Sequence, residues 1–174
     1  VLHQQGRTSP PEDKKDAKLG AAPSQDQLNH LLVHYQANRL EEAEELATLL
    51  TQQFPNHPFA WKVLGVVFQQ TGRLSESLAP KQKAAELSPQ DAEAHSNLGN
   101  TLQELRRLEE AEASHGRAIA LKPDYTEAHY NLGITLKELG RLNEAEASYR
   151  KTIALKPDYA KAHNNLGVTL KELG

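Results

Sequence analysis

Apolar residues recur at helical spacing from Leu28 onward. A first stripe follows the i, i+3, i+4, i+7 pattern of one helix face, through Leu28, Leu31, Leu32 and Tyr35. A second stripe begins at Leu40, after the polar pair Asn38 and Arg39, and ends before Pro55. Proline lacks an N–H and disfavours helix in the residue before it. The pattern therefore predicts two helices of about 14 residues each, joined by a short turn.

This helix pair repeats along the chain at an interval of 34 residues. The triplet Asn-Leu-Gly begins at Asn97, Asn131 and Asn165, and residues 92–125 agree with residues 126–159 at 24 of 34 positions. A fixed period of this length is typical of stacked helical repeats, in which each unit contacts only its neighbours. The sequence therefore predicts an all-α solenoid of antiparallel helix pairs, with about four and a half repeats.

Residues 1–23 differ from the rest of the chain. They contain three prolines and a run of mixed charge, and no helical apolar stripe, which is typical of a tail or linker. An arm that docks on a neighbouring chain is the alternative. We expect the repeat array to occupy residues 24–174, with units at 24–57, 58–91, 92–125 and 126–159 and a half repeat at 160–174.

The turn between the two helices of a unit has one recurrent position, which holds Asn38, Gly72, Arg106 and Gly140. A residue at the end of a helix often needs a positive φ, which Gly and Asn tolerate. We therefore expect a strained or rearranged turn at Arg106.

Unit 58–91 is the least regular. Pro80 falls in the middle of a predicted helix, where it removes one backbone hydrogen bond. We expect it to kink or interrupt that helix, and either a drifted repeat or a hinge would explain it. Ser77 and Lys81 replace the Ala and the aromatic residue expected there.

The spaced residues resemble the tetratricopeptide repeat. Unit 58–91 carries Trp61-x2-Leu64-Gly65-x2-Phe68 and then Pro89, and unit 126–159 carries Leu132-Gly133, Ala145-x3-Tyr149 and Pro157. The near-identity of adjacent units also resembles bacterial arrays and the repeat region that precedes protein O-GlcNAc transferases. The resemblance implies that the helix pairs stack into a right-handed superhelix.

The same resemblance gives the repeated glycine a role. It implies that the two helices of a unit approach closely at Gly65, Gly99, Gly133 and Gly167, and that Ala43, Ala111 and Ala145 occupy the matching place on the other helix. A larger side chain at either place would cost about 1–3 kcal/mol. Leu31 replaces the glycine in the first unit, so we expect its two helices to lie further apart.

Composition excludes several classes of function. The chain has no Cys, which excludes disulfides, thiol catalysis and Cys-ligated zinc. Its net charge of −3 gives no electrostatic case for nucleic acid, and no run of apolar residues is long enough to span a membrane. There is also no Met, so we expect a processed form or a segment of a longer protein. We expect a cytoplasmic protein, with periplasmic and extracellular locations left open.

The eight histidines raise the question of a metal site. His95, His129 and His163 recur at one repeat position, too far apart to share an ion, so we expect them to pack. His30 and His34 share a helix face and would make half a zinc site, but no third ligand accompanies them. No sequence motif of a hydrolase or a phosphate-binding loop is present. We expect no enzyme activity, no cofactor and no metal.

The recurring asparagines are the candidate binding residues. In related arrays the position of Asn97, Asn131 and Asn165 points into a concave groove, where an amide that both donates and accepts can hold the backbone of an extended peptide. The alternative is that these amides only bond neighbouring helices. The other candidate groove residues are Asn100, Tyr130, Lys137, Lys161 and Lys171.

Chaperone-binding members of the family instead use a carboxylate clamp of Lys, Asn, Asn, Lys and Arg. The corresponding residues here are Ser96, Asn100, Asn131, Lys161 and Asn165. Two of the three basic groups are missing, so we do not expect this chain to bind a C-terminal carboxylate.

Three functions fit these observations. The first is a protein–protein interaction scaffold that binds an extended peptide in its concave groove. The second is the substrate-recruiting arm of a larger transferase. The third is self-assembly through the half repeat at 160–174, where Leu166, Val168 and Leu170 are expected to lack full cover. The sequence names no partner.

Overall fold

A computed structural model describes residues 22–174, which form nine helices and no strand. Most of the predicted tail at residues 1–23 lies outside the described part of the chain. The helices are α1 (Gln25–Gln36), α2 (Leu40–Gln53), α3 (Pro58–Gln70), α4 (Leu74–Leu87), α5 (Ala92–Glu104), α6 (Leu108–Leu121), α7 (Thr126–Glu138), α8 (Leu142–Leu155) and α9 (Ala160–Leu173).

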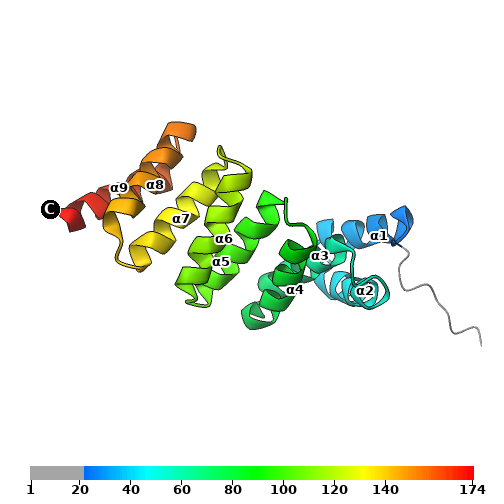
Figure 1. Cartoon of the computed structure of the whole chain (residues 1–174). Coiled ribbons are helices and arrows are strands. Elements are labelled where there is room, and N and C mark those ends of the chain that lie inside the picture. The colour runs from blue at the N-terminus through cyan, green and yellow to red at the C-terminus, as the bar shows by residue number, and fades with distance from the viewer. Residues whose placement is uncertain (1–21) are drawn as a thin grey trace, which may run out of the picture.

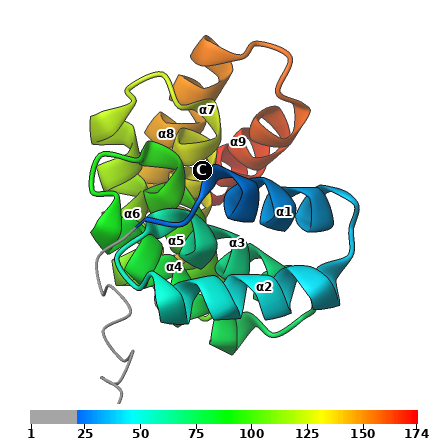
Figure 2. The same cartoon turned by 90° about the vertical axis from the view of Figure 1, so that its right-hand side faces the viewer.

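Helices that are neighbours in the sequence are neighbours in space. They follow one another from α1 at one end of the molecule to α9 at the other (Figure 1). A view turned by 90° has α1 and α2 in front and the later pairs behind them (Figure 2). Each helix packs mainly on the one before it and the one after it, as expected for a solenoid. The predicted all-α array of helix pairs is confirmed.

The odd-numbered helices form one face of the array. Helix α1 contacts α3, α5 contacts α7, and α7 contacts α9, whereas no two even-numbered helices of the described chain approach each other to the same extent. The array is therefore tighter on the side of the odd-numbered helices, which makes that side the concave one. Helices α3 and α5 contact each other less than the other three pairs of neighbouring odd-numbered helices do.

The turn inside each unit takes the predicted left-handed conformation. The φ angles are 56° at Asn38, 78° at Gly72, 61° at Arg106 and 75° at Gly140. Arg106 keeps the same geometry as the glycines, so its turn is strained and not rearranged. Positive φ costs a residue with a Cβ about 1–2 kcal/mol.

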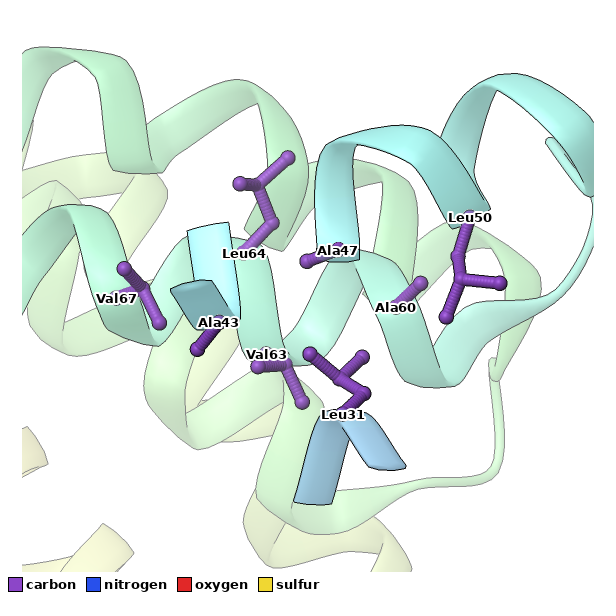
Figure 3. Close-up of a cluster of buried hydrophobic side chains, with 8 residues drawn as sticks. All are labelled: Leu31, Ala43, Ala47, Leu50, Ala60, Val63, Leu64 and Val67. Carbon is purple, nitrogen blue, oxygen red and sulfur yellow. The ribbon is translucent and has the colours of Figure 1, made fainter. Parts of the chain in front are cut away.

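The largest apolar core cluster lies at the N-terminal end of the array. Its side chains come from α1, α2 and α3 and converge between these helices (Figure 3). Leu31 is fully buried there, next to Ala43 and Ala47. Helices α1 and α2 approach each other along less of their length than α3 and α4 do, which agrees with the expected effect of Leu31 in place of glycine.

Pro80 does not interrupt its helix. Helix α4 continues from Leu74 to Leu87 with the proline inside it, so the predicted interruption is wrong. Pro80 is buried against α3, where its Cβ lies 3.5 Å from the position that a Cβ on Gly65 would take. Burial of the ring supplies apolar contact that offsets the missing hydrogen bond.

The glycine of each pair is covered by a different residue from the one expected. A Cβ on Gly99 would lie 2.6 Å from the His115 ring, and a Cβ on Gly133 would lie 2.6 Å from the Tyr149 ring. On Gly65 the covering atom is Cγ of Lys81, also at 2.6 Å. The predicted partners, Ala43, Ala111 and Ala145, are fully buried but do not supply the atoms nearest to these glycines. The close approach is therefore between glycine and a large side chain.

The covering residues are polar and buried. Lys81 donates to Gln69 Oε1 and, at 2.7 Å, to the Thr101 hydroxyl, and burial lowers the pKa of its amine to about 8. Neither ring nitrogen of His115 has a hydrogen-bond partner within residues 22–174, and burial lowers the pKa of its imidazole to about 4. Burial also raises the pKa of Tyr149 to about 12.

Candidate functional site

The predicted binding asparagines lie on three successive odd-numbered helices. Asn97 is on α5, Asn131 on α7 and Asn165 on α9, and all three side chains are half-buried. Each precedes the Leu-Gly pair that packs its helix, so the repeat places the three amides at equivalent positions. The structure therefore places them at equivalent positions on the odd-numbered helices.

Two of these amides bond to the preceding repeat. Asn131 Nδ2 donates to Asn100 Oδ1 at 2.7 Å, and Asn165 Nδ2 donates to the Tyr130 hydroxyl at 3.2 Å. These bonds are the helix-bridging alternative that the sequence left open. Each bond uses one of the two N–H groups of the amide, which leaves the second N–H and the carbonyl oxygen for a ligand.

Lys137 takes part in a ladder between repeats that the sequence analysis missed. Its Nζ lies 2.9 Å from Glu172 Oε1. At the equivalent positions Gln69 donates to Glu104 at 2.9 Å and Gln103 donates to Glu138 at 3.4 Å. The sequence signal is a glutamate 35 residues after each of these side chains. This partner makes Lys137 a weaker candidate for binding a ligand.

The remaining candidates differ in their surroundings. The Tyr130 ring lies between Tyr149 and Tyr159, with ring centroids 6.1 and 5.0 Å away. Lys161 and Lys171 are exposed on α9. The eight candidates thus form no single cluster, because they are spread over α5, α7 and α9.

A pocket opens between α1, α3, α4 and α5 and holds about 280 Å³. Asn97 is the predicted site residue that lines it. Its other lining residues are Leu32, Tyr35, Phe59, Lys62, Val63, Val66, Lys81, Ala84, Glu93 and Ala94. The sequence pattern does not predict this pocket, because its residues come from three repeats.

The aromatic position at the start of α3, α5, α7 and α9 has a structural role. The ring nitrogens of His95, His129 and His163 lie 3.2, 3.0 and 2.8 Å from the carbonyl oxygen of the proline six residues earlier. Trp61 Nε1 donates to the Pro55 carbonyl at 2.9 Å in the same way. Each ring N–H therefore closes the turn between repeats. This bond adds a specific role to the packing that the sequence predicted.

In the described part of the chain, the histidine pair on α1 belongs to no group of metal ligands. The Nε2 atoms of His30 and His34 are 3.0 Å apart. Within residues 22–174, no group of three or more His, Cys, Asp or Glu side chains is placed to hold a metal ion. None of the helices formed by these residues is both long and apolar enough to cross a membrane.

The chain matches known repeat families along most of its length. Profiles described as tetratricopeptide or TPR repeats match residues 28–92, 82–113, 104–140 and 135–174. No curated protein matches the chain.

Several solved structures share the fold. A crystal structure of MamA is 25% identical, with a TM-score of 0.78, over 81% of this chain and 82% of that one. YrrB, described as a TPR protein with an unusual peptide-binding site, is 23% identical, with a TM-score of 0.79, over 87% of this chain and 78% of its own. The first TPR domain of Spaghetti (RPAP3), bound to the HSP90 peptide SRMEEVD, is 24% identical, with a TM-score of 0.65, over 67% of this chain and 92% of its own. The repeat matches and the helix-pair array together show that this chain is a tetratricopeptide repeat protein.

Proposed function

We propose that this protein is a non-catalytic scaffold that binds an extended segment of a partner protein along its odd-numbered helices. The observation that carries the proposal is the row of half-buried amides at Asn97, Asn131 and Asn165 on this face. An extended peptide offers N–H and C=O groups along its length, and amides that donate and accept can bind them with little sequence preference.

The fold of known peptide binders supports the proposal. YrrB and the RPAP3 domain are described as peptide-binding proteins, and both have the helix-pair array seen here. Recognition of a C-terminal carboxylate is not part of our proposal. Ser96 and Asn165 stand where the clamp has basic groups, and Asn100 is already bonded to Asn131.

The test is a triple substitution of Asn97, Asn131 and Asn165 by Ala. A library of random synthetic peptides is passed over the immobilised protein, and the affinity of the retained peptides is measured by fluorescence anisotropy. We expect the triple variant to bind them at least tenfold more weakly, since hydrogen bonds each contribute about 0.5–1.5 kcal/mol. Circular dichroism and the melting temperature show whether the variant is folded.

The matched control replaces three exposed residues on even-numbered helices, Ala79, Ala113 and Lys151, by Ser. These positions lie on α4, α6 and α8. Equal affinity of the wild type and the Asn variant, both folded, contradicts the proposal. Equal loss in the control shows that the effect is not specific to the odd-numbered face.

A second candidate function is self-association, which the exposed face of α9 favours. Val168, Leu170 and Leu173 are 46%, 39% and 39% exposed. Gly167 has no atom within 4 Å of the place of its Cβ, whereas each equivalent glycine is covered by a large side chain. Val33 and Leu49 are exposed at the opposite end of the array, so a head-to-tail contact would bury apolar surface on both copies.

Light scattering over a wide range of concentration tests this second function. We expect the wild type to associate and the double variant Val168→Glu, Leu170→Glu to stay monomeric. A wild type that remains a monomer at all concentrations contradicts self-association and leaves the peptide-binding proposal standing.

A further inference from the structure

The pocket of about 280 Å³ lies where the odd-numbered helices separate. Its lining residues come from α1, α3, α4 and α5, and α3 and α5 approach each other less than the other neighbouring odd-numbered helices do. The looser packing at this step opens a depression on the concave face. Asn97, the first residue of the amide row, is among its lining residues.

The pocket has an apolar floor. Leu32, Phe59, Val63 and Val66 supply most of it, together with the ring of Tyr35. Sites for small molecules hold roughly 300–1,000 Å³, so this pocket is at or below the lower end of that range. Its size suits one large side chain better than a free cofactor or metabolite.

Glu93 is the charged group of the lining whose side chain has neither an ion-pair nor a hydrogen-bond partner within residues 22–174. Lys62 is paired with Asp91, and the amine of Lys81 is bonded to Gln69 and Thr101. Glu93 is exposed and forms no ion pair with any residue of the described chain. A positive charge next to the apolar group would complement it.

We propose that this pocket is the anchor subsite for a large apolar side chain, such as Leu or Phe, in an extended peptide that carries Lys or Arg beside it. The apolar side chain fills the space over Phe59 and Val66. The basic side chain reaches Glu93, and the Asn97 amide bonds the peptide backbone between them. This inference rests on the proposed function and names the chemistry of its partner.

A second pocket, between α6, α7 and α8, provides the contrast. It holds about 610 Å³ and is lined by Glu109, Glu112 and Glu144, with Ala147 beside them. Arg141 pairs with both Glu112 and Glu144, so two of these three carboxylates have an internal partner. It lies mainly on even-numbered helices, away from the amide row, and serves as the control surface.

The probes are synthetic fluorescein-labelled peptides with Gly-Ser flanks and a central Leu-Lys, Ala-Lys or Leu-Glu pair. We expect Leu-Lys to bind roughly tenfold more tightly than Ala-Lys, because the pocket removes the larger apolar side chain of Leu from water. We expect Leu-Lys to bind about threefold more tightly than Leu-Glu at low salt, and this preference to fade as salt rises.

Two variants test the lining. Val66→Glu should weaken Leu-Lys binding at least tenfold, because a carboxylate would occupy the apolar floor. Glu93→Gln should abolish the preference for Lys over Glu and leave the preference for Leu over Ala. Ala147→Glu in the second pocket should change neither the preference for Lys over Glu nor the preference for Leu over Ala. Circular dichroism and melting curves confirm the fold of each variant, and Glu93→Gln, at an exposed position, keeps the test valid if Val66→Glu fails to fold.

The outcomes separate this inference from the proposed function. Equal binding of Leu-Lys by the wild type and a folded Val66→Glu variant overturns the anchor subsite. If the triple Asn variant still loses affinity, the proposed peptide-binding face is retained and only the anchor subsite is rejected. Equal binding of Leu-Lys and Leu-Glu at low salt overturns the role of Glu93. Failure of every library peptide to bind overturns both the face and the subsite.

Discussion

The second and fourth repeats have the same backbone and different chemistry at their centre. Both pair two helices through a glycine, Gly65 in α3 and Gly133 in α7, and both turns place a glycine at positive φ. A Tyr149 ring covers the glycine of the fourth repeat, whereas the stem of Lys81 covers that of the second. The two side chains are both buried.

This difference shows that the space over the glycine requires a large side chain, whereas the polarity of that side chain can vary. The Tyr149 ring fills its place as an apolar body. The Lys81 stem fills the same place, but its amine must then find partners inside the protein, which are Gln69 and Thr101. The second repeat therefore carries a buried charge that the fourth does not, and its stability should depend on pH in a different way.

The largest expected effect comes from removing the two covering side chains. Tyr149→Ala should lower the free energy of unfolding by about 3–5 kcal/mol, as for other large buried aromatics. Lys81→Ala should cost clearly less, because the loss of stem packing is offset by relief of a buried amine. Urea unfolding followed by circular dichroism measures both, with the exposed Lys151→Ala as control. A cost for Lys81→Ala equal to that for Tyr149→Ala would contradict the comparison.

The next effect is an opposite dependence of stability on pH. The pKa of Lys81 falls from 10.5 to about 8 in the folded protein, so between these values the unfolded chain binds more protons and stability rises with pH. The full rise is about 2–3 kcal/mol, because solvent screens part of the shift. The pKa of Tyr149 rises from 10.0 to about 12, so its contribution is present below pH 10 and is lost above it.

Difference curves isolate the two groups. Unfolding free energies of the wild type and of Lys81→Met are compared between pH 7 and 10. We expect the free energy of unfolding of the wild type to rise relative to that of the variant as pH rises. Above pH 10, the free energy of unfolding of the wild type should fall relative to that of Tyr149→Phe. Parallel curves for the wild type and Lys81→Met would show that the amine is not buried as described.

A smaller effect comes from filling the glycine positions. Gly133→Ala should destabilise by about 1–3 kcal/mol, because its Cβ would lie 2.6 Å from a ring that is held on all sides. Gly65→Ala should cost a similar amount, since its Cβ would lie 2.6 Å from the buried Cγ of Lys81 and 3.4 Å from the Lys81 backbone nitrogen. Gly167→Ala meets no atom within 4 Å and should stabilise α9 by up to about 1 kcal/mol through helix propensity. Melting temperatures rank the three, and an equal loss at Gly167 would contradict this ordering.

The smallest effect should be the same in both repeats. Trp61→Phe and His129→Phe each remove one ring N–H that closes a turn onto a proline carbonyl. Each should cost about 1 kcal/mol in the free energy of unfolding, measured by urea unfolding. Ser75→Ala, at an exposed position on α4, is the control and should change little. A cost in only one repeat would show that the two turns are not equivalent.

The features that the sequence predicted are those that recur at short range. The 34-residue period located the helix pairs. The turn position predicted a positive φ, which Arg106 also adopts because the neighbouring backbone geometry decides it. The exposure of Val168 and Leu170 also followed from the period.

The features that the sequence analysis missed depend on partners in other helices. The side chain that covers Gly133 belongs to Tyr149, on the next helix, and nothing in the local pattern around the glycine points to it. Pro80 was expected to kink or interrupt α4, but its burial against α3 became visible only in three dimensions. Bonding between helices was foreseen as an alternative for the asparagines, but the choice of Asn100 as the partner of Asn131, like the pocket beside Asn97, needs the register between helices.

The most direct test of the binding face is the nuclear magnetic resonance spectrum of the asparagine side-chain amides. The labelled protein is titrated with a peptide retained from the random library, and the side-chain signals of Asn97, Asn131 and Asn165 are followed. We predict that these signals shift with one common affinity, while those of exposed residues on α4, α6 and α8 do not. Shifts confined to the even-numbered helices, with the three asparagine signals unchanged at saturation, would contradict the account.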